Sequence, residues 1–270
     1  MSLNIRQAQT FIELHGTATE RARMEALRGS GTDTVMPPEL AALQNPDGGF
    51  PYGFQAGEPS TLHHTCQVVD WLEDLGQTTS QSAIAAYAFL RSRQTLGGIW
   101  REDPALRRDD LPLWMDPDST AADIYLTALC AATLLRDEDA SIGVDRAVVW
   151  LQTQQGRDGL LQGFKLHASW MAMPAFAEML GQEARPTRRL ITGLGKALTP
   201  EWAASMIAEM LRRLLDAGYS LRTEVVARGW ELLQQAQQPD GSFESEEAPE
   251  GAVAATLAVL QVARLLGRTR

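Results

Sequence analysis

Two carboxyl groups stand close together in the segment DPDSTA, residues 116–121, directly before a stretch with helical periodicity. Asp116 and Asp118 are two residues apart, and two neighbouring carboxyls cannot both ionise without a cost. An apolar surrounding raises the pKa of the carboxyl that faces it, so one member of such a pair can stay protonated and act as a general acid. Such a pair is therefore compatible with proton-transfer chemistry where an apolar surrounding faces one of its members.

The same segment also fits a purely structural role. Acidic and hydroxyl side chains beside a proline at a helix start are common N-caps. EPST at 58–61 and APEG at 248–251 open two other expected helices with the same pattern. Capping alone is therefore the alternative interpretation of Asp118.

The segment LHHTCQVVD, residues 62–70, holds the densest group of potential metal ligands in the sequence. His63, Cys66 and Asp70 share one face of a helix, but residues 63 and 70 lie about 10 Å apart along the axis. Zinc bonds are only about 2.0 to 2.3 Å long, so one ion does not reach all three side chains. We therefore expect no metal and no cofactor, and His63 with Cys66 and a ligand from another helix is the open alternative.

Aromatic and imidazole side chains gather near the expected helix starts. Such rings can line an apolar pocket that binds a small molecule, and the alternative for any single ring is ordinary core packing. The candidate pocket residues are Trp114, Tyr125, His63, His64, His167, Trp170 and Trp202.

Four similar turns recur along the chain: QNPDGGF at 44–50, QTLGGIW at 94–100, QGRDGLL at 155–161 and QQPDGSF at 237–243. Each reads Gln, two residues, Asp or Gly, Gly, one residue, then a bulky apolar residue. The glycine can end a helix, and the glutamine side chain can reach the backbone groups exposed there. The third copy ends in Leu161 instead of an aromatic residue, and Phe164 is the expected substitute.

Each turn lies between two stretches with helical periodicity, so the repeating unit is a helix pair. The long interval between Gln155 and Gln237 fits one additional, irregular pair over 185–218. We expect about eleven to twelve helices, no strand, and one all-α domain over residues 1–270, with concentric inner and outer helix layers. The expected helices cover 4–28, a short PPELAALQ segment, 60–75, 80–94, 119–135, 144–155, 166–180, 185–198, 200–218, 221–237 and 250–266.

Composition places the chain among folded globular proteins, since 44% of its 270 residues are apolar and 21% are charged. The net charge of −10 argues against nucleic acid as a partner. The two cysteines, Cys66 and Cys130, lie in apolar helical patterns, so we expect reduced thiols and a cytoplasmic protein. The longest uncharged apolar run, 251–260, is about half of a bilayer span, and the N-terminus lacks the apolar region of a signal peptide, so we expect no transmembrane segment.

The turn signature resembles the QW-type repeat of the squalene cyclase and protein prenyltransferase superfamily, over about residues 37–266. This resemblance implies an α6/α6 toroid with a central apolar cavity that holds an isoprenoid. DPDSTA resembles the Asp, any, Asp, Asp, Thr, Ala motif of class II terpene cyclases, with Ser119 in place of the third Asp. The resemblance implies that Asp118 protonates an alkene or epoxide, that Asp116 influences its protonation, and that nearby rings stabilise the carbocation.

We therefore expect a class II terpene cyclase-like enzyme that cyclises or isomerises an isoprenoid by acid initiation. One alternative is a toroid that binds lipid or another protein without catalysis. Another is a subunit similar to the β-subunit of a zinc-dependent prenyltransferase. Cyclases of this class usually enclose the substrate between two helical domains, and this chain has the length of one, so a homodimer or a second subunit would close the cavity.

Overall fold

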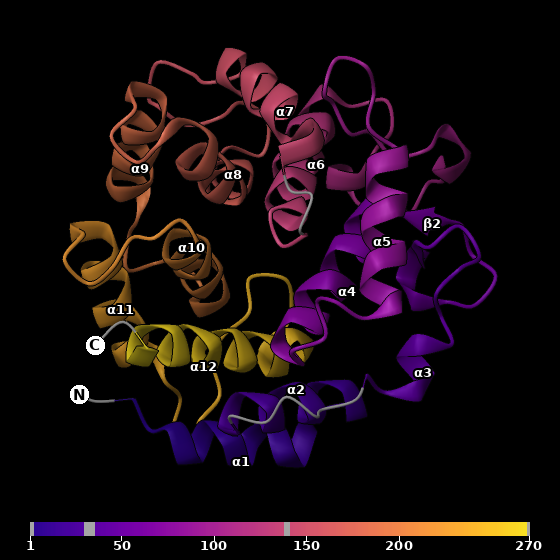
Figure 1. The fold of residues 1–270 in the computed structure, drawn as a ribbon. Coiled ribbons are helices and arrows are strands. Elements are labelled where there is room, and N and C mark those ends of the chain that lie inside the picture. Colours follow the sequence, from indigo (N-terminus) through magenta and orange to yellow (C-terminus); the bar gives the residue numbers. More distant parts are fainter. Residues whose placement is uncertain (1–2, 30–35, 138–140, 269–270) are drawn as a thin grey trace. The chain divides into compact units, whose positions relative to one another are not determined.

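The computed structural model describes residues 3–29, 36–137 and 141–268, and within them it contains twelve α-helices and two strands of two residues each (Figure 1). The expected all-α class is confirmed. The chain divides into two compact units, one formed by Met1–Thr34 with Leu194–Arg270 and the other by Val35–Gly193. The organisation of 1–270 as one domain stays a prediction.

The unit Val35–Gly193 is built around α6, whose residues are almost all buried. α6 packs against α4 on one side and α8 on the other. The helices that precede the turns, α5 and α7, contact these central helices, as the expected helix pairs require. The helices of this unit are α3 (Pro38–Ala41), α4 (Leu62–Asp74), α5 (Gln81–Ser92), α6 (Thr120–Leu134), α7 (Ser141–Thr153), α8 (Lys165–Leu180) and the greater part of α9 (Arg185–Ala197).

Two short strands contradict the expectation of no strand. β1 (Phe50–Pro51) pairs antiparallel with β2 (Ser60–Thr61), and the hairpin between them carries the 3-10 turn η1 (Tyr52–Phe54). Strands of two residues are too short to leave an alternating pattern in a sequence, which is why the pattern does not reveal them. Two further 3-10 turns, η2 (Pro104–Leu106) and η3 (Leu113–Met115), lie before α6.

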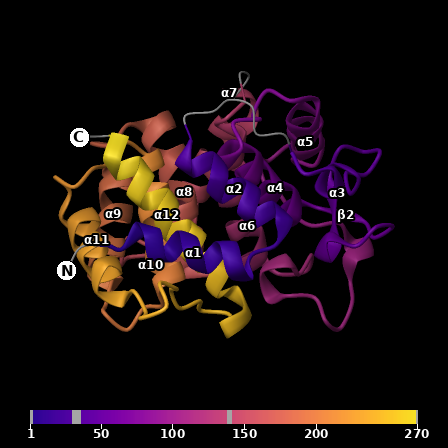
Figure 2. The same cartoon turned by 90° about the horizontal axis from the view of Figure 1, so that it is seen from below.

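The other unit is built around α12 (Ala252–Arg268), which packs against α10 (Ala204–Asp216), α1 (Ile5–His15) and α2 (Ala18–Arg28), as Figure 2 shows for α1 and α2. α11 (Glu224–Ala236) packs against α10. A short 3-10 turn, η4 (Pro249–Gly251), precedes α12.

The expected single helix over 4–28 is wrong, because the structure has two helices there. Gly16 caps the end of α1, and Thr17 begins α2 with a capping box, in which its side chain accepts from the Glu20 N–H and Glu20 binds back to the Thr17 N–H. Reciprocal bonds of this kind satisfy two backbone donors and fix a new helix start. The sequence TATE carries this signal.

The segment Pro249–Gly267 is long and apolar enough to cross a membrane by length and composition, and half of its most apolar window is buried inside the structure. A core helix of a globular protein passes the same test. The expected lack of a transmembrane segment therefore stays a prediction.

The glutamine of every repeat turn joins two backbone carbonyls, which confirms its expected role at the turn. One carbonyl belongs to the glycine four residues later, and the other belongs to the start of a helix farther along the chain or, for the last turn, to the start of α1. The pairs of acceptors are Gly48 and Ser82 for Gln44, Gly98 and Gly143 for Gln94, Gly159 and Pro186 for Gln155, and Gly241 and Asn4 for Gln237.

The last of these contacts assigns a role to α1 that the sequence does not indicate. The glutamine of the fourth turn donates to a carbonyl at the start of α1, just as those of the first three turns donate to carbonyls at the starts of α5, α7 and α9. Gly241 adopts φ +92°, and a Cβ there would lie 2.5 Å from the backbone carbonyl carbon of Gln7 in α1. Only glycine fits this close contact between turn and helix.

The bulky residue that ends each turn is fully buried and is held by a buried hydroxyl. The N–H groups of Phe50, Trp100, Leu161 and Phe243 donate to the hydroxyls of Thr65, Thr127, Ser169 and Thr256 at 2.9 to 3.1 Å. Leu161 therefore takes the place of the aromatic residue in the third turn. The expectation that Phe164 substitutes for it is wrong, because Phe164 is the N-cap residue of α8.

Candidate functional site

Several aromatic and imidazole rings meet at the N-terminal ends of α4 and α6. His63 lies at their centre, with ring centroids 5.4 Å from His64, 6.3 Å from Trp114 and 6.1 Å from Tyr125. We call this group the aromatic cluster: Phe54, His63, His64, Trp114, Tyr125 and Phe164. The structure thus brings together four of the residues predicted from the sequence.

The hairpin places Phe54 in the cluster with a strained backbone conformation. Phe54 has φ +55°, a left-handed conformation that aromatic residues rarely adopt. The turn places its ring 4.9 Å from His64 and 5.1 Å from Trp71. Strained residues of this kind concentrate at functional sites, so the hairpin supports the choice of this region as the candidate site.

His64 is a structural member of the cluster. Its Nε2 accepts a hydrogen bond from the Gly53 N–H at 3.2 Å, and its Nδ1 lies 2.8 Å from the Thr61 hydroxyl. Burial lowers the pKa of His64 to about 4, so the ring is neutral at neutral pH. With both nitrogens engaged, His64 fixes the hairpin onto the start of α4.

His63 and Tyr125 form the polar part of the cluster. Nδ1 of His63 lies 3.5 Å from the Tyr125 hydroxyl. Burial, assisted by the neighbouring His64, lowers the pKa of His63 to about 3, while Asp70 opposes the shift. His63 is thus neutral at neutral pH, and its ring face can contact a cation without adding a positive charge.

Glu102 is a buried carboxyl that sequence reasoning missed. It lies two residues after the end of the second turn and is 2% exposed. Its two oxygens accept hydrogen bonds from the backbone N–H groups of Leu62 at 3.0 Å and His63 at 3.1 Å. Burial raises the pKa of Glu102 to about 7, and these two bonds oppose the shift. The segment RED at 101–103 after a repeat tryptophan gave no pattern that would single it out.

Residues 101–118, which we call the strap, connect the second turn to α6. Arg108 reaches the hairpin, where its Nη1 lies 2.9 Å from the Glu58 carboxylate and its guanidinium stacks 4.8 Å from the centroid of the Tyr52 ring. η3 carries Trp114 into the aromatic cluster. The strap thus ties the hairpin, the cluster and the start of α6 together.

Asp118 is neither a helix cap nor a buried acid in this structure. Its carboxylate accepts from Nε and Nη2 of Arg107 at 2.6 and 2.7 Å, and its side chain is 60% exposed. The bond to Arg107 lowers the pKa of Asp118 below its usual range. The N-cap of α6 is Ser119, whose hydroxyl accepts from the Ala122 N–H. The capping interpretation of Asp118 is therefore wrong.

Asp116 and Asp123 complete the charged groups at the start of α6. Asp116 is half-buried, and its Oδ1 accepts from the Asp118 N–H at 2.9 Å, which shapes the turn before the helix. Asp123, which sequence reasoning missed, has a side chain only 3% exposed and binds Arg101 through Nε at 2.9 Å. Two arginines and three aspartates thus surround this helix start.

The other predicted pocket residues lie elsewhere. His167 and Trp170 are on α8 with ring centroids 4.5 Å apart, and Trp170 is fully buried. Trp202 belongs to the other unit, where it is half-buried just before α10.

The potential metal ligands of α4 point to different partners. Sγ of Cys66 lies 3.7 Å from Sγ of Cys130 in the core, and Asp70 pairs with Arg136 at 2.9 Å. Both cysteines are free thiols, as expected. Among the described residues, no group of three His, Cys, Asp or Glu side chains is arranged to hold a metal ion.

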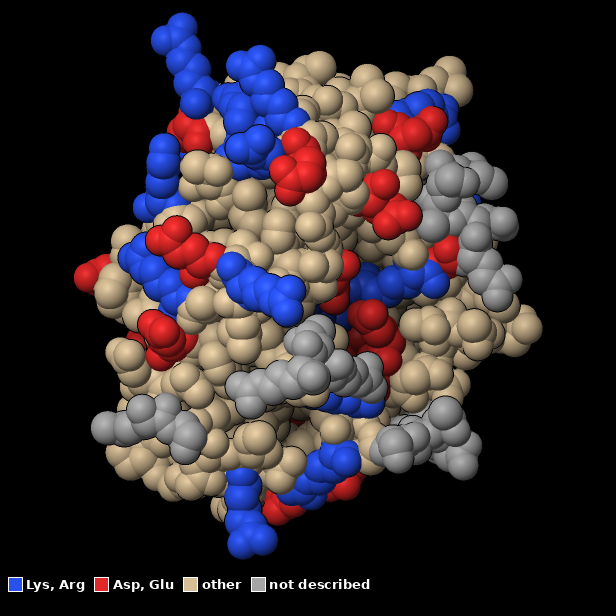
Figure 3. Space-filling view, turned by 60° about the vertical axis from the view of Figure 1, so that its left-hand side comes forward, with Lys and Arg blue, Asp and Glu red and all other residues tan. Residues whose placement is uncertain are grey.

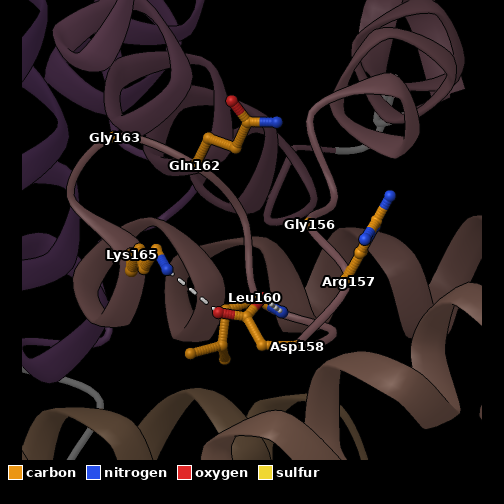
Figure 4. Close-up of a pocket in the computed structure, with 7 residues that line it drawn as sticks. All are labelled: Gly156, Arg157, Asp158, Leu160, Gln162, Gly163 and Lys165. Carbon is orange, nitrogen blue, oxygen red and sulfur yellow. Dashed lines mark hydrogen bonds and ion pairs between the residues drawn. The ribbon is translucent and has the colours of Figure 1, made fainter.

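A hollow of about 580 Å³ lies at the third repeat turn, lined by residues of 156–165 (Figure 4). Lys165 forms an ion pair with Asp158 at 3.0 Å inside it, while Arg157 extends away from that pair. Its charged lining does not suit an isoprenoid. On the face drawn in Figure 3, acidic side chains lie beside many of the basic ones, and the expected lack of a nucleic-acid partner stays a prediction.

Comparison with known proteins gives one curated relative and several solved structures. No family model matches the chain. Drimenyl diphosphate synthase from Streptomyces showdoensis is 32% identical over 132 residues, which are 48% of this chain and 22% of that protein. The match thus covers about a fifth of the relative's own length.

The solved structures resemble the whole chain in fold. A protein from Actinoplanes superposes with a TM-score of 0.66 at 15% identity, covering 97% of this chain and 98% of that one. The type II terpene cyclase MstE from Scytonema gives a TM-score of 0.60 at 15% identity, covering 98% of this chain and 87% of that one. A variant of MstE in complex with geranylgeranyl dihydroxybenzoate, its substrate, gives 0.59. The fold is therefore the one shared with type II terpene cyclases, as the repeat resemblance implied.

Proposed function

We propose that this protein is a class II terpene cyclase-like enzyme that cyclises or isomerises an isoprenoid by protonation. The observation that carries the proposal is the aromatic cluster, in which neutral rings of His63, Trp114 and Tyr125 gather beside the helix that Asp116 and Asp118 precede. Rings placed side by side stabilise a carbocation through their negative faces. The fold likeness to MstE and the relation to drimenyl diphosphate synthase support the same chemistry.

The proposed reaction begins when protonated Asp118 gives its proton to a terminal alkene carbon of the substrate. The alkene electron pair forms the new C–H bond, and the resulting carbocation is attacked by an internal double bond, which closes a ring. Loss of a proton from the final cation restores an alkene, so the product is an isomer of the substrate. Asp116 would influence the proton occupancy of Asp118, and the cluster rings would lie against the cation.

We assign substrate binding to the aromatic cluster. An isoprenoid is a flexible apolar chain, and its affinity comes from the apolar and aromatic area that it covers. MstE binds geranylgeranyl dihydroxybenzoate, and the curated relative is named for drimenyl diphosphate. We therefore propose prenyl chains that end in a polar head group as the substrate class.

A non-catalytic lipid-binding protein is the second candidate, favoured by one specific observation. Asp118 is exposed and paired with Arg107, whereas a carboxyl that donates a proton must first be protonated. Direct incubation with linear prenyl diphosphates and with geranylgeranyl dihydroxybenzoate, followed by mass spectrometry, separates the candidates. An enzyme yields cyclic isomers that the Asp118→Asn variant does not form, whereas a binding protein returns the substrate unchanged.

A further inference from the structure

Three successive residues, from the end of the second turn into the strap, connect two helices. The Trp100 N–H donates to the Thr127 hydroxyl at 3.0 Å, and Nε of Arg101 donates to Asp123 at 2.9 Å, both on α6. Glu102 binds α4 instead, where its carboxylate accepts two backbone N–H bonds. These residues therefore set the position of the start of α4 relative to α6.

Glu102 fixes the first turn of α4 at two consecutive residues. The first N–H groups of a helix have no partner within the helix. Glu102 accepts from those of Leu62 at 3.0 Å and His63 at 3.1 Å, while the Thr61 hydroxyl accepts from the third, that of His64. Because two adjacent N–H groups bind one carboxylate, the bonds fix the rotation of this turn as well as its position. The direction in which the His63 side chain leaves the helix depends on that rotation.

The His63 ring contacts groups from α6 and from the strap. Its Nδ1 lies 3.5 Å from the Tyr125 hydroxyl on α6, and its centroid lies 6.3 Å from that of Trp114 in the strap. A separation of 3.5 Å is at the long limit of a hydrogen bond, so a small displacement of α4 breaks this contact. The face that His63 and Tyr125 form together therefore depends on the bonds that Glu102 makes at the start of α4.

We propose that Glu102 is a positioning residue of the aromatic cluster: its carboxylate holds the His63 ring beside Tyr125, and its protonation releases the ring. A carboxylate only accepts hydrogen bonds, whereas a protonated carboxyl also carries an O–H donor. The two N–H groups of α4 already supply donors, so protonation weakens one of the two bonds and the first turn of α4 shifts. The inference rests on the proposed function, in which this cluster lies against the carbocation.

The neighbours of Glu102 leave it as the group that changes charge near neutral pH. Burial raises its pKa to about 7. Arg93 lowers this pKa and Asp103 raises it, and the two pair with each other at 3.1 Å. Burial lowers the pKa of His63 to about 3 and raises that of Cys130 well above its usual value, so neither titrates near pH 7. The charged or titratable groups that act on Glu102 or lie next to it come from α4, α6, the end of α5 and the strap: His63, Cys130, Asp123, Arg93, Arg101 and Asp103.

The first test follows the two adjacent histidine rings by NMR from pH 5 to pH 8 and needs no substrate. Neither imidazole titrates in this range, so a change in a ring signal reports a change around that ring. We expect the Cε1 signal of His63 to shift with a midpoint near pH 7, and the nuclear Overhauser effect between His63 and Tyr125 to weaken below it. The ring of His64, held by Gly53 and Thr61, is the internal control and should stay constant. A constant His63 signal, an unchanged contact with Tyr125, or equal shifts of both rings would overturn the proposal.

The second test compares Glu102→Gln with Asp103→Asn. The amide of Glu102→Gln resembles the protonated carboxyl and does not titrate, so the His63 ring should keep its low-pH signal throughout. Asp103 is the matched control because it is the next residue, is 43% exposed and binds the Ala105 N–H instead of α4. Asp103→Asn should therefore keep the titration of the wild type. A titration that persists in Glu102→Gln, or that disappears in Asp103→Asn, refutes the assignment. If Glu102→Gln does not fold, the titration of the wild type decides alone.

Kinetics on a converted substrate separate positioning from a merely structural role. The His63 face meets positive charge only after the substrate is protonated, so its displacement should act on kcat and not on KM. We expect Glu102→Gln to lower kcat by at least about tenfold with KM within about threefold, and Asp103→Asn to keep both within about twofold. An unchanged kcat in Glu102→Gln, or a loss that appears in KM alone, contradicts the proposal.

These measurements separate the two proposals. If the wild type forms a cyclic product while the His63 ring does not respond to pH and Glu102→Gln keeps its kcat, the cyclase proposal stands and this inference falls. If the His63 ring follows the protonation of Glu102 but no prenyl substrate is converted, the positioning role stands and the cyclase proposal falls.

Discussion

Glu102 and His63 are joined by a hydrogen bond of 3.1 Å from the His63 N–H to the Glu102 carboxylate, and burial moves their side-chain pKa values in opposite directions. The carboxyl has a pKa raised to about 7, and the imidazole has one lowered to about 3. In both groups burial disfavours the charged form. The start of α4 is thus held by a carboxyl that titrates near neutral pH.

Stability should fall as pH rises because of Glu102. Its pKa is about 7 when folded against 4.5 as the reference value, so between these limits the folded state holds more protons than the unfolded state. The free energy of unfolding then decreases with rising pH, by about 3 kcal/mol in total. Urea unfolding of the wild type and Glu102→Gln from pH 5 to pH 8 measures this. We expect the wild type to lose stability relative to the variant, and parallel pH curves would disprove the assignment.

At the start of α6, Asp118 should be needed for activity and Ser119 for stability. Ser119→Ala removes the N-cap and should lower the free energy of unfolding by about 1 kcal/mol while leaving activity in place. Asp118→Asn should abolish activity and leave the free energy of unfolding nearly unchanged, since its ion pair is exposed. Thermal unfolding and product assays on both variants check this. Loss of activity in Ser119→Ala but not in Asp118→Asn is the outcome that reverses the assignment.

Trp114 should contribute to substrate binding. Its ring is half-buried and faces His63, so Trp114→Ala removes a wall of the aromatic cluster. We expect kcat/KM to fall at least tenfold, with little change in Tm. The adjacent Leu113, which is 71% exposed, is the control, and Leu113→Ala should keep kcat/KM within about twofold. Similar effects of both substitutions would exclude Trp114 from the site.

Loss of the ion pairs of Arg136 should destabilise the fold more than loss of an exposed ion pair. Arg136 is 11% exposed and binds Asp70 at 2.9 Å and Glu73 at 2.7 Å. Arg136→Met should lower the free energy of unfolding by about 3 to 5 kcal/mol because Asp70, whose side chain is only 14% exposed, loses a charged partner. Lys165→Met, which breaks the exposed pair with Asp158, should cost about 0 to 1 kcal/mol. Denaturant unfolding of both variants gives the comparison, and equal costs would contradict it.

The repeat turns could be predicted from sequence because their signals are local. The glutamine, the glycine and the final apolar residue occur at fixed spacing, and each makes the contact that its type suggests. The hydroxyls that hold the final residue could not be found in this way. Thr65 follows Phe50 by 15 residues, whereas Ser169 follows Leu161 by 8, so no fixed spacing marks them.

The candidate site was predicted only in part, for a similar reason. His63, His64, Trp114 and Tyr125 lie near helix starts, a position that the sequence reveals. Glu102 and Arg107 act through contacts with residues 11 to 40 positions away, which only the path of the strap determines. The path of the strap also determines the exposed ion pair of Asp118 with Arg107, which the sequence does not reveal.

The most direct test of the central claim is product analysis after incubation in D₂O with a linear prenyl diphosphate. Acid-initiated cyclisation predicts a cyclic isomer that retains its diphosphate and carries one deuterium from the solvent, with no product from Asp118→Asn. The claim is contradicted if the wild type forms no cyclic product from any prenyl substrate, if the product has lost its diphosphate without deuterium uptake, or if Asp118→Asn forms the same product at the same rate.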